Sequence, residues 1–165
     1  LLDATDEPIS KLPESTSLSV EENRKIAWDF HAALNNRDVD KALSLFTDDA
    51  SWIVMPGATI YTKQDIRKYL EKMMRNFPKF IVRDIHPPVV SGDMVTHEYV
   101  HEVRITDGRE AHIPAVVVME LRNGKIVQVR HYMDKLEGAK QTARGFFEKR
   151  AVAGIVKQVE ELIYP

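Results

Sequence analysis

The sequence predicts an α+β fold in which helices come first and a sheet of long antiparallel strands follows. Three amphipathic segments before Phe77-Pro78 have helical spacing. After that point the pattern changes to alternating runs separated by two turn signals, Asp107-Gly108 and Asn123-Gly124. Helices and strands that are segregated along the chain are typical of the α+β class.

Each predicted helix has a recognisable start. The first opens at Ser19-Val20-Glu21-Glu22, which has the spacing of a capping box. Asp38 caps a second, short helix, and Thr62 with Asp65 three residues later starts a third. The apolar residues of these helices are Ile26, Ala27, Phe30, Leu34, Ala42, Leu45, Phe46, Ile66, Tyr69, Leu70, Met73 and Met74.

The strands are bounded by turn residues. A short first strand ends at Pro56-Gly57, and the second extended run is interrupted by Pro87-Pro88, which suits an edge strand or a bulge. The expected strands cover Ala50–Met55, Phe80–Val90, Met94–Thr106, Glu110–Leu121 and Lys125–Met133.

Length and composition narrow the class of protein. A chain of 165 residues corresponds to one domain, with residues 1–18 as an arm and residues 137–165 as a helical extension packing on the same domain. The net charge of −2 gives no reason to expect nucleic acid or a membrane as partner, and no apolar run spans about 18 residues. The absence of cysteine excludes disulfides and thiol catalysis. A cytoplasmic location is expected.

One face of the predicted sheet combines apolar residues with histidines. Two-residue turns at both signals place Tyr99 opposite Val116, and Val116 opposite His131. Trp52 and Val54 follow the pattern of the first strand and join this face. The face carries Val95, His97, Tyr99, His101, Val103, Ile105, His112, Val116, Val118, Val127, Val129, His131 and Met133.

The opposite face has a middle row that is too apolar to be solvated. With the same register this row consists of Ile113, Ala115, Val117, Met119 and Leu121. Two alternatives explain how this row is buried: a second copy of the chain packs on it, or the helix expected over residues 138–163 does.

Two local motifs resemble the SnoaL-like family of the nuclear transport factor two-like superfamily. Phe46-Thr47-Asp48-Asp49-Ala50-Ser51-Trp52 is similar to that family's step into its first strand. Leu121–Val127 and Arg130–Asp134 resemble its final hairpin, and the likeness covers about residues 20–136. The resemblance implies a cone over residues 19–136, with a curved, mixed but mostly antiparallel sheet closed by N-terminal helices. It also implies one deep apolar pocket, a C-terminal helix and usually a homodimer.

The family's catalytic sets do not carry over residue by residue. Where limonene epoxide hydrolases keep an arginine and two aspartates, this chain has Tyr99, His101 and His131. The aspartate base of SnoaL-type cyclases again corresponds to His131, and the base of ketosteroid isomerases corresponds to Met55.

These observations favour an enzyme that transfers protons in an apolar pocket, as an isomerase, cyclase or dehydratase. His131 is expected to act as general acid or base, His101 to assist it, and Tyr99 to polarise a substrate oxygen. No cofactor and no metal site are expected. Two alternatives stay open: a non-catalytic binder of an apolar ligand, and a dimeric adaptor. The expected pocket wall consists of Trp52, Val54, His97, Val103, His112, Val116, Val118, Val129 and Met133.

Overall fold

The protein is described by a computed structural model that covers residues 19–55 and 57–163, the last five by their backbone alone. This part of the chain contains helices and strands in the order that the α+β prediction requires, and that prediction is confirmed. The helices are α1 (Val20–Asn35), α2 (Val39–Ser44), α3 (Lys63–Asn76), α4 (Lys135–Thr142) and α5 (Gly145–Ile163). The strands are β1 (Phe46–Met55), β2 (Thr59–Tyr61), β3 (Lys79–Asp84), β4 (Val89–Ser91), β5 (Met94–Arg104), β6 (Glu110–Arg122) and β7 (Lys125–Met133).

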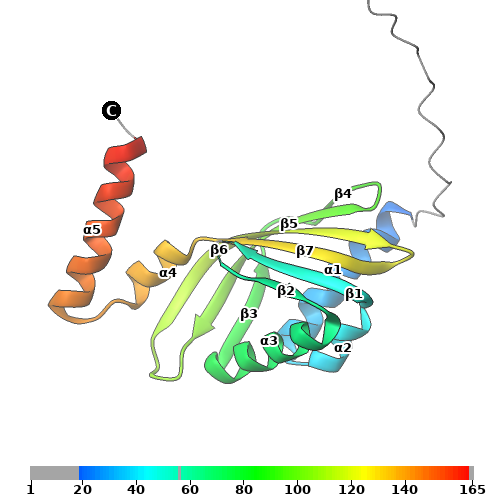
Figure 1. The fold of residues 1–165 in the computed structure, drawn as a ribbon, viewed down its shortest axis with the longest axis horizontal. Coiled ribbons are helices and arrows are strands. Elements are labelled where there is room, and N and C mark those ends of the chain that lie inside the picture. The colour runs from blue at the N-terminus through cyan, green and yellow to red at the C-terminus, as the bar shows by residue number, and fades with distance from the viewer. Residues whose placement is uncertain (1–18, 56, 164–165) are drawn as a thin grey trace, which may run out of the picture.

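The strands form one curved sheet in the order β2-β1-β7-β6-β5-β3, with β4 added to one end of β5. All pairs are antiparallel except β1 and β7, which run parallel. Helices α1, α2 and α3 lie on the concave side (Figure 1). The prediction of a mixed, mostly antiparallel sheet closed by N-terminal helices is therefore confirmed.

The helix starts agree with the capping signals. Ser19 and Glu22 form the reciprocal capping box of α1. Asp38 accepts from the amide of Lys41, and Thr62 accepts from the amide of Asp65. Each side chain satisfies an amide that the first helical turn leaves without a partner.

The strand boundaries differ from prediction in three places. β1 begins at Phe46 rather than Ala50, so Phe46 belongs to the sheet and not to α2. The predicted strand Phe80–Val90 is divided into β3 and β4 around Pro87-Pro88, where the prolines cannot donate to a ladder. The three-residue β2 was not predicted, because so short a segment has no period to detect.

The predicted pairing of β5 with β6 was wrong by one residue. Tyr99 pairs with Ala115 rather than Val116, and His101 pairs with Ile113 rather than Pro114. The hairpin has a three-residue loop, because the amide of Ile105 donates to the carbonyl of Arg109 and Gly108 has a φ of +86°. A shift of one residue exchanges the two faces of a strand.

A bulge in β7 shifts the second pairing as well. The Asn123-Gly124 turn has two residues with positive φ, as expected, and Arg122 pairs with Lys125. Between Glu120 and Leu121 the register then shifts, because Val127 is an extra residue on β7. As a result Val117, and not Val116, lies opposite His131.

The two shifts exchange the predicted faces of β6. The buried, concave-side residues of this strand are Ala111, Ala115, Val117, Met119 and Leu121. Most of the row that we expected on the outer surface is therefore part of the core. The residues that we expected to face the pocket, His112, Val116 and Val118, lie on the convex side instead.

Helix α1 is fixed to the sheet by polar contacts as well as by its apolar face. The Asn35 side chain donates to the carbonyl of Val82 at 3.0 Å and accepts from the Val82 amide at 2.6 Å. At the other end of the helix, Asn23 donates to the carbonyl of Gly92 at 3.0 Å. Phe30 packs edge-on against both Phe46 and Trp52, with ring centroids 5.5 and 5.6 Å apart.

The C-terminal segment forms two helices. α4 packs on β6, where Gly138 lies against Ile113. α5 is joined to the rest through α4 and an Arg109–Glu148 ion pair, and it otherwise extends away from the sheet (Figure 1). No helix in the described part of the chain is long and apolar enough to cross a membrane.

Candidate functional site

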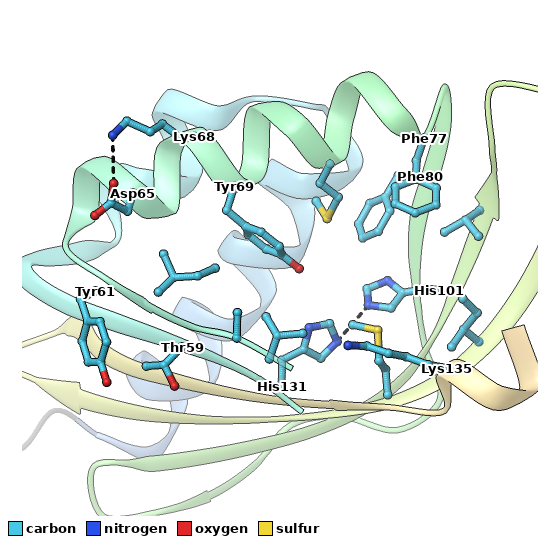
Figure 2. Close-up of a pocket in the computed structure, with 17 residues that line it drawn as sticks. Thr59, Tyr61, Asp65, Lys68, Tyr69, Phe77, Phe80, His101, His131 and Lys135 are labelled. Atoms are coloured by element: carbon cyan, nitrogen blue, oxygen red, sulfur yellow. Dashed lines mark hydrogen bonds and ion pairs between the residues drawn. The ribbon is translucent and has the colours of Figure 1, made fainter. Parts of the chain in front are cut away.

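A pocket of about 640 Å³ opens between α3 and the concave face of the sheet (Figure 2). Its volume is in the range of sites for small organic molecules. Most of its wall is apolar, formed by Val54, Ile60, Met73, Phe77, Phe80, Val103, Ile113 and Met133.

Two histidines meet at the inner wall of this pocket. The Nε2 atoms of His101 on β5 and His131 on β7 are 3.1 Å apart, which is hydrogen-bond distance. The strands that carry them are separated by β6, so only the curvature of the sheet brings the two rings together. Both side chains are buried, with 3% and 4% of their surface exposed.

Burial determines the charge of this pair. Burial, and after it the electrostatic effects of His31 and Lys135, lower the pKa of His131 to about 4. Burial and then the neighbouring His131 hold the pKa of His101 well below its usual value. Both rings are therefore neutral at pH 7.

The hydrogen bond between two neutral rings assigns their protons. One Nε2 donates and the other accepts, so one ring has a bare Nδ1 and the other carries its proton on Nδ1. Neither Nδ1 has a hydrogen-bond partner among the described residues. Both Nδ1 atoms are buried, so the pair keeps one unused acceptor and one unused donor behind the pocket wall.

Tyr69 and Lys135 were not among the predicted site residues. Tyr69 comes from α3, packs edge-on against Trp52, and directs its hydroxyl towards the histidine pair (Figure 2). Burial raises the pKa of this hydroxyl, so it stays protonated and can donate. Lys135, the first residue of α4, extends its amine towards His131. Periodicity indicated only a buried face for Tyr69, and nothing in the local sequence shows where α4 packs.

The predicted site residues fall into three groups. His101, His131, Val54, Val103 and Met133 line the pocket. His112, Val116 and Val118 lie on the convex side, because of the register shifts. The residues that lie beneath the pocket wall, buried in the core, are Trp52, His97, Tyr99 and Val129.

Tyr99 does not face the pocket as predicted. It lies between His31 and His101, with ring centroids 4.7 and 4.9 Å away, and 3% of its surface is exposed. Burial strongly raises the pKa of its hydroxyl. Tyr69 instead presents a hydroxyl to the pocket.

Charged groups gather at the pocket mouth. Asp65 and Lys68 form an ion pair at 3.0 Å on the first turns of α3 (Figure 2). Among the described residues, the pocket has no three histidine or carboxylate side chains close enough to share a metal ion.

Solved structures with the same fold come from several bacteria. A hypothetical protein with a ketosteroid isomerase-like fold from Catenulispora acidiphila, in complex with trimethylamine, has 19% identity and a TM-score of 0.68, covering 73% of this chain and 94% of that one. An NTF2-like protein from Burkholderia pseudomallei has 17% identity and a TM-score of 0.69, covering 77% and 100%. An epoxide hydrolase of M. tuberculosis, described as LEH-like, has 23% identity and a TM-score of 0.67, covering 83% and 97%.

These likenesses concern the fold, because identities this low do not carry a function. A comparison with curated proteins gives no match. The family comparison is more specific: the SnoaL-like domain matches residues 28–129, which is more than half of the chain. It runs from the middle of α1 to the middle of β7 and includes most of the wall of the pocket described above, with His131 two residues beyond its end. The chain therefore belongs to the SnoaL-like domain family.

Proposed function

We propose that the pocket binds an apolar small molecule with a carbonyl or hydroxyl oxygen, and that the His101–His131 pair transfers a proton to or from it. The reaction would be an isomerisation, cyclisation or dehydration. The observation that carries this proposal is the direct Nε2–Nε2 contact of 3.1 Å on an otherwise apolar wall.

The pair can act as a base because it is neutral. One imidazole takes a proton from a carbon or oxygen of the ligand, and its partner accepts a hydrogen bond from the resulting imidazolium. A low pKa makes His131 a weak base in the empty pocket. A negative oxygen forming on the ligand beside it would raise that pKa during the transfer.

Two other side chains support the developing negative charge. The Tyr69 hydroxyl and the Lys135 amine both point towards the region beside His131 (Figure 2). A hydroxyl donor and a cation in a pocket with little water stabilise an oxyanion more strongly than they would in solvent. In this role Tyr69 takes the place that the sequence suggested for Tyr99.

The proposal is tested by histidine NMR and turnover with a panel of apolar ketones, lactones and epoxides. We expect ligands to shift the ring signals of His101 and His131 and to leave those of His112, exposed on the convex side, unchanged. His131→Gln is expected to lower turnover by about 10² to 10⁴-fold, the usual loss for a general base. Tyr69→Phe should lower it less, and His112→Gln should not change it. Turnover that survives His131→Gln would contradict the proposal.

A non-catalytic binder is the second candidate function. It is favoured by one observation: the two histidines already satisfy each other, and both are held neutral. In that case His131→Gln leaves ligand affinity nearly unchanged, and no member of the panel is converted. The adaptor alternative receives no such support, because it expects a small or filled pocket and about 640 Å³ is open here.

A further inference from the structure

A second cluster of titratable side chains lies outside the pocket, where α1 crosses β3 and β5. It consists of His31 on α1, Asp84 at the end of β3 and His97 on β5. The ligand atoms of the three residues lie within 4.8 Å of one another. The two histidines are 3% and 1% exposed, whereas 40% of the Asp84 side chain reaches solvent. The cluster therefore combines buried nitrogen ligands with a carboxylate that an ion can approach.

The distances within the cluster suit a shared ion. The Nδ1 atom of His31 is 3.1 Å from Oδ1 of Asp84, and Nε2 of His97 is 3.5 Å from the same oxygen. A divalent metal binds such atoms at about 2.0–2.2 Å, so neighbouring ligand atoms end up roughly 3–3.5 Å apart. Both distances to the Asp84 oxygen have this spacing, and the remaining pair, the two histidine nitrogens, lies within 4.8 Å.

The fold holds the three residues in place independently of any ion. Asn35, one helical turn after His31, makes two hydrogen bonds to the backbone of Val82, two residues before Asp84. Asp84 is itself paired with Tyr99, two residues after His97. All three ligands are thus attached to positions fixed by backbone hydrogen bonds, which lowers the entropic cost of gathering them.

His97 can release the nitrogen that an ion needs. Its Nε2 faces two acceptors, the Asp84 carboxylate and the carbonyl of His86 at 2.9 Å, so the proton is on Nε2 and is donated there. Its Nδ1 is buried and has no partner among the described residues. Moving the proton to Nδ1 leaves a neutral ring with a bare Nε2, while the His86 carbonyl adds an oxygen next to it. The His31 and His97 rings are stacked at 4.6 Å, so sharing an ion would tilt at least one of them.

We propose that His31, Asp84 and His97 form a binding site for a divalent transition metal, with Zn²⁺ as the best match. Two imidazole nitrogens and one carboxylate oxygen are a usual ligand set for zinc, and less suitable for Mg²⁺ or Ca²⁺, which prefer oxygen. The site joins α1 to β3 and β5, so its ion stabilises the closed end of the cone. This role does not depend on the proposed chemistry of the pocket.

The test uses the full chain, stripped with chelator and titrated with Zn²⁺ by calorimetry and with Co²⁺ by visible absorption. We expect one ion per chain, a Co²⁺ spectrum typical of nitrogen and oxygen ligands, and a higher melting temperature with Zn²⁺. His97→Gln and Asp84→Asn are expected to weaken binding by at least about 100-fold. His112→Gln is the matched control, because His112 is exposed on the convex side of the same sheet and should leave binding unchanged.

Two results would overturn the proposal. One is an unaltered chain that binds Zn²⁺ no more tightly than the His97→Gln and Asp84→Asn variants. The other is tight binding that His112→Gln removes. Circular dichroism of each stripped variant shows whether it is folded. If Asp84→Asn disturbs folding, His31→Gln with intact helix content supplies the same comparison. Ligand turnover in the pocket is measured separately and does not affect this outcome.

Discussion

At the scale of single residues, His131 links the candidate site to the stability of the fold. Its pKa is about 4 in the folded protein, and that of an unfolded histidine is about 6.5. Between these pH values the unfolded chain holds a proton that the folded chain lacks. The contribution of His131 to the free energy of unfolding is therefore fully present above about pH 6.5. It is lost as the pH falls from there towards 4.

This difference predicts a pH-dependent effect of His131→Gln. From pH 7 to pH 5 the unaltered protein should lose about 2 kcal/mol more of its free energy of unfolding than the variant, at about 1.4 kcal/mol per pH unit below pH 6.5. Urea unfolding at both pH values measures it. His112→Gln should follow the unaltered protein, and parallel curves for all three proteins would contradict the assigned burial of His131.

Individual residues also show how far the candidate site could be predicted. His101 and His131 were assigned to one face through β6, and this held because the two one-residue shifts in the pairing of β6 cancel in their effect on the faces of β5 and β7. Tyr69 and Lys135 could not be placed, because they belong to helices whose position over the sheet depends on tertiary packing. The same reason applies to His31 and Asp84, which are 53 residues apart in the chain.

At the scale of elements, β6 shows the weakness of prediction from turns. Its alternation was recognised, but the face that points inward depends on a single extra loop residue beside Gly108. Helix boundaries were more predictable, because caps such as Ser19 and Thr62 act within one turn. Local signals therefore specify where elements begin, and longer-range geometry decides which side of a strand is buried.

Helix α4 supplies a prediction at this scale. A Cβ atom at Gly138 would lie 2.9 Å from Cδ1 and 3.2 Å from Cγ1 of Ile113, so a branched side chain there must displace Ile113. Gly138→Val should lower the free energy of unfolding by about 1–3 kcal/mol through overpacking. It should also weaken ligand binding, because α4 positions Lys135. Thermal unfolding and ligand titration measure the two effects.

Gly154 offers the matched control for that substitution. It lies in α5, and a Cβ atom there meets nothing within 4 Å. Gly154→Val should therefore change neither the stability of the cone nor ligand affinity. If the two variants lose stability alike, the effect at position 138 does not come from the contact with Ile113, because helix propensity alone favours valine over glycine.

At the scale of the whole molecule, the described residues leave the convex face of the sheet without a covering element. With the observed register, Pro114, Val116 and Val118 form its middle row, beside Tyr132, which is 41% exposed. This row is apolar, as expected for the outer face. It contains none of the residues that the sequence placed there, because the register shift moved those to the concave side. We propose that a second copy of the chain covers this face.

Light scattering after size-exclusion chromatography tests the dimer. The chain of 18.9 kDa should elute as a species of about 38 kDa, twice that mass. Val116→Lys should shift it to the monomer mass, because it places a charge in the middle of the interface. Val20→Lys adds the same charge at the start of α1, on the opposite side of the sheet, where Val20 is 49% exposed, and should leave the dimer intact. A monomeric unaltered protein would exclude this interface.

The parallel pairing of β1 with β7 has a consequence for how the chain folds. Trp52 of β1 pairs with Val129 of β7, and β1 has only the three-residue β2 on its other side. During translation, β1 thus emerges early but waits for its main neighbour until nearly the whole domain has been synthesised. Such long-range pairing slows folding, because the long intervening segment must close before the contacts between the two strands form. A nascent chain that ends before β7 would leave the backbone hydrogen-bonding edge of β1 without its main partner, and an unpaired strand edge is a site where chains aggregate.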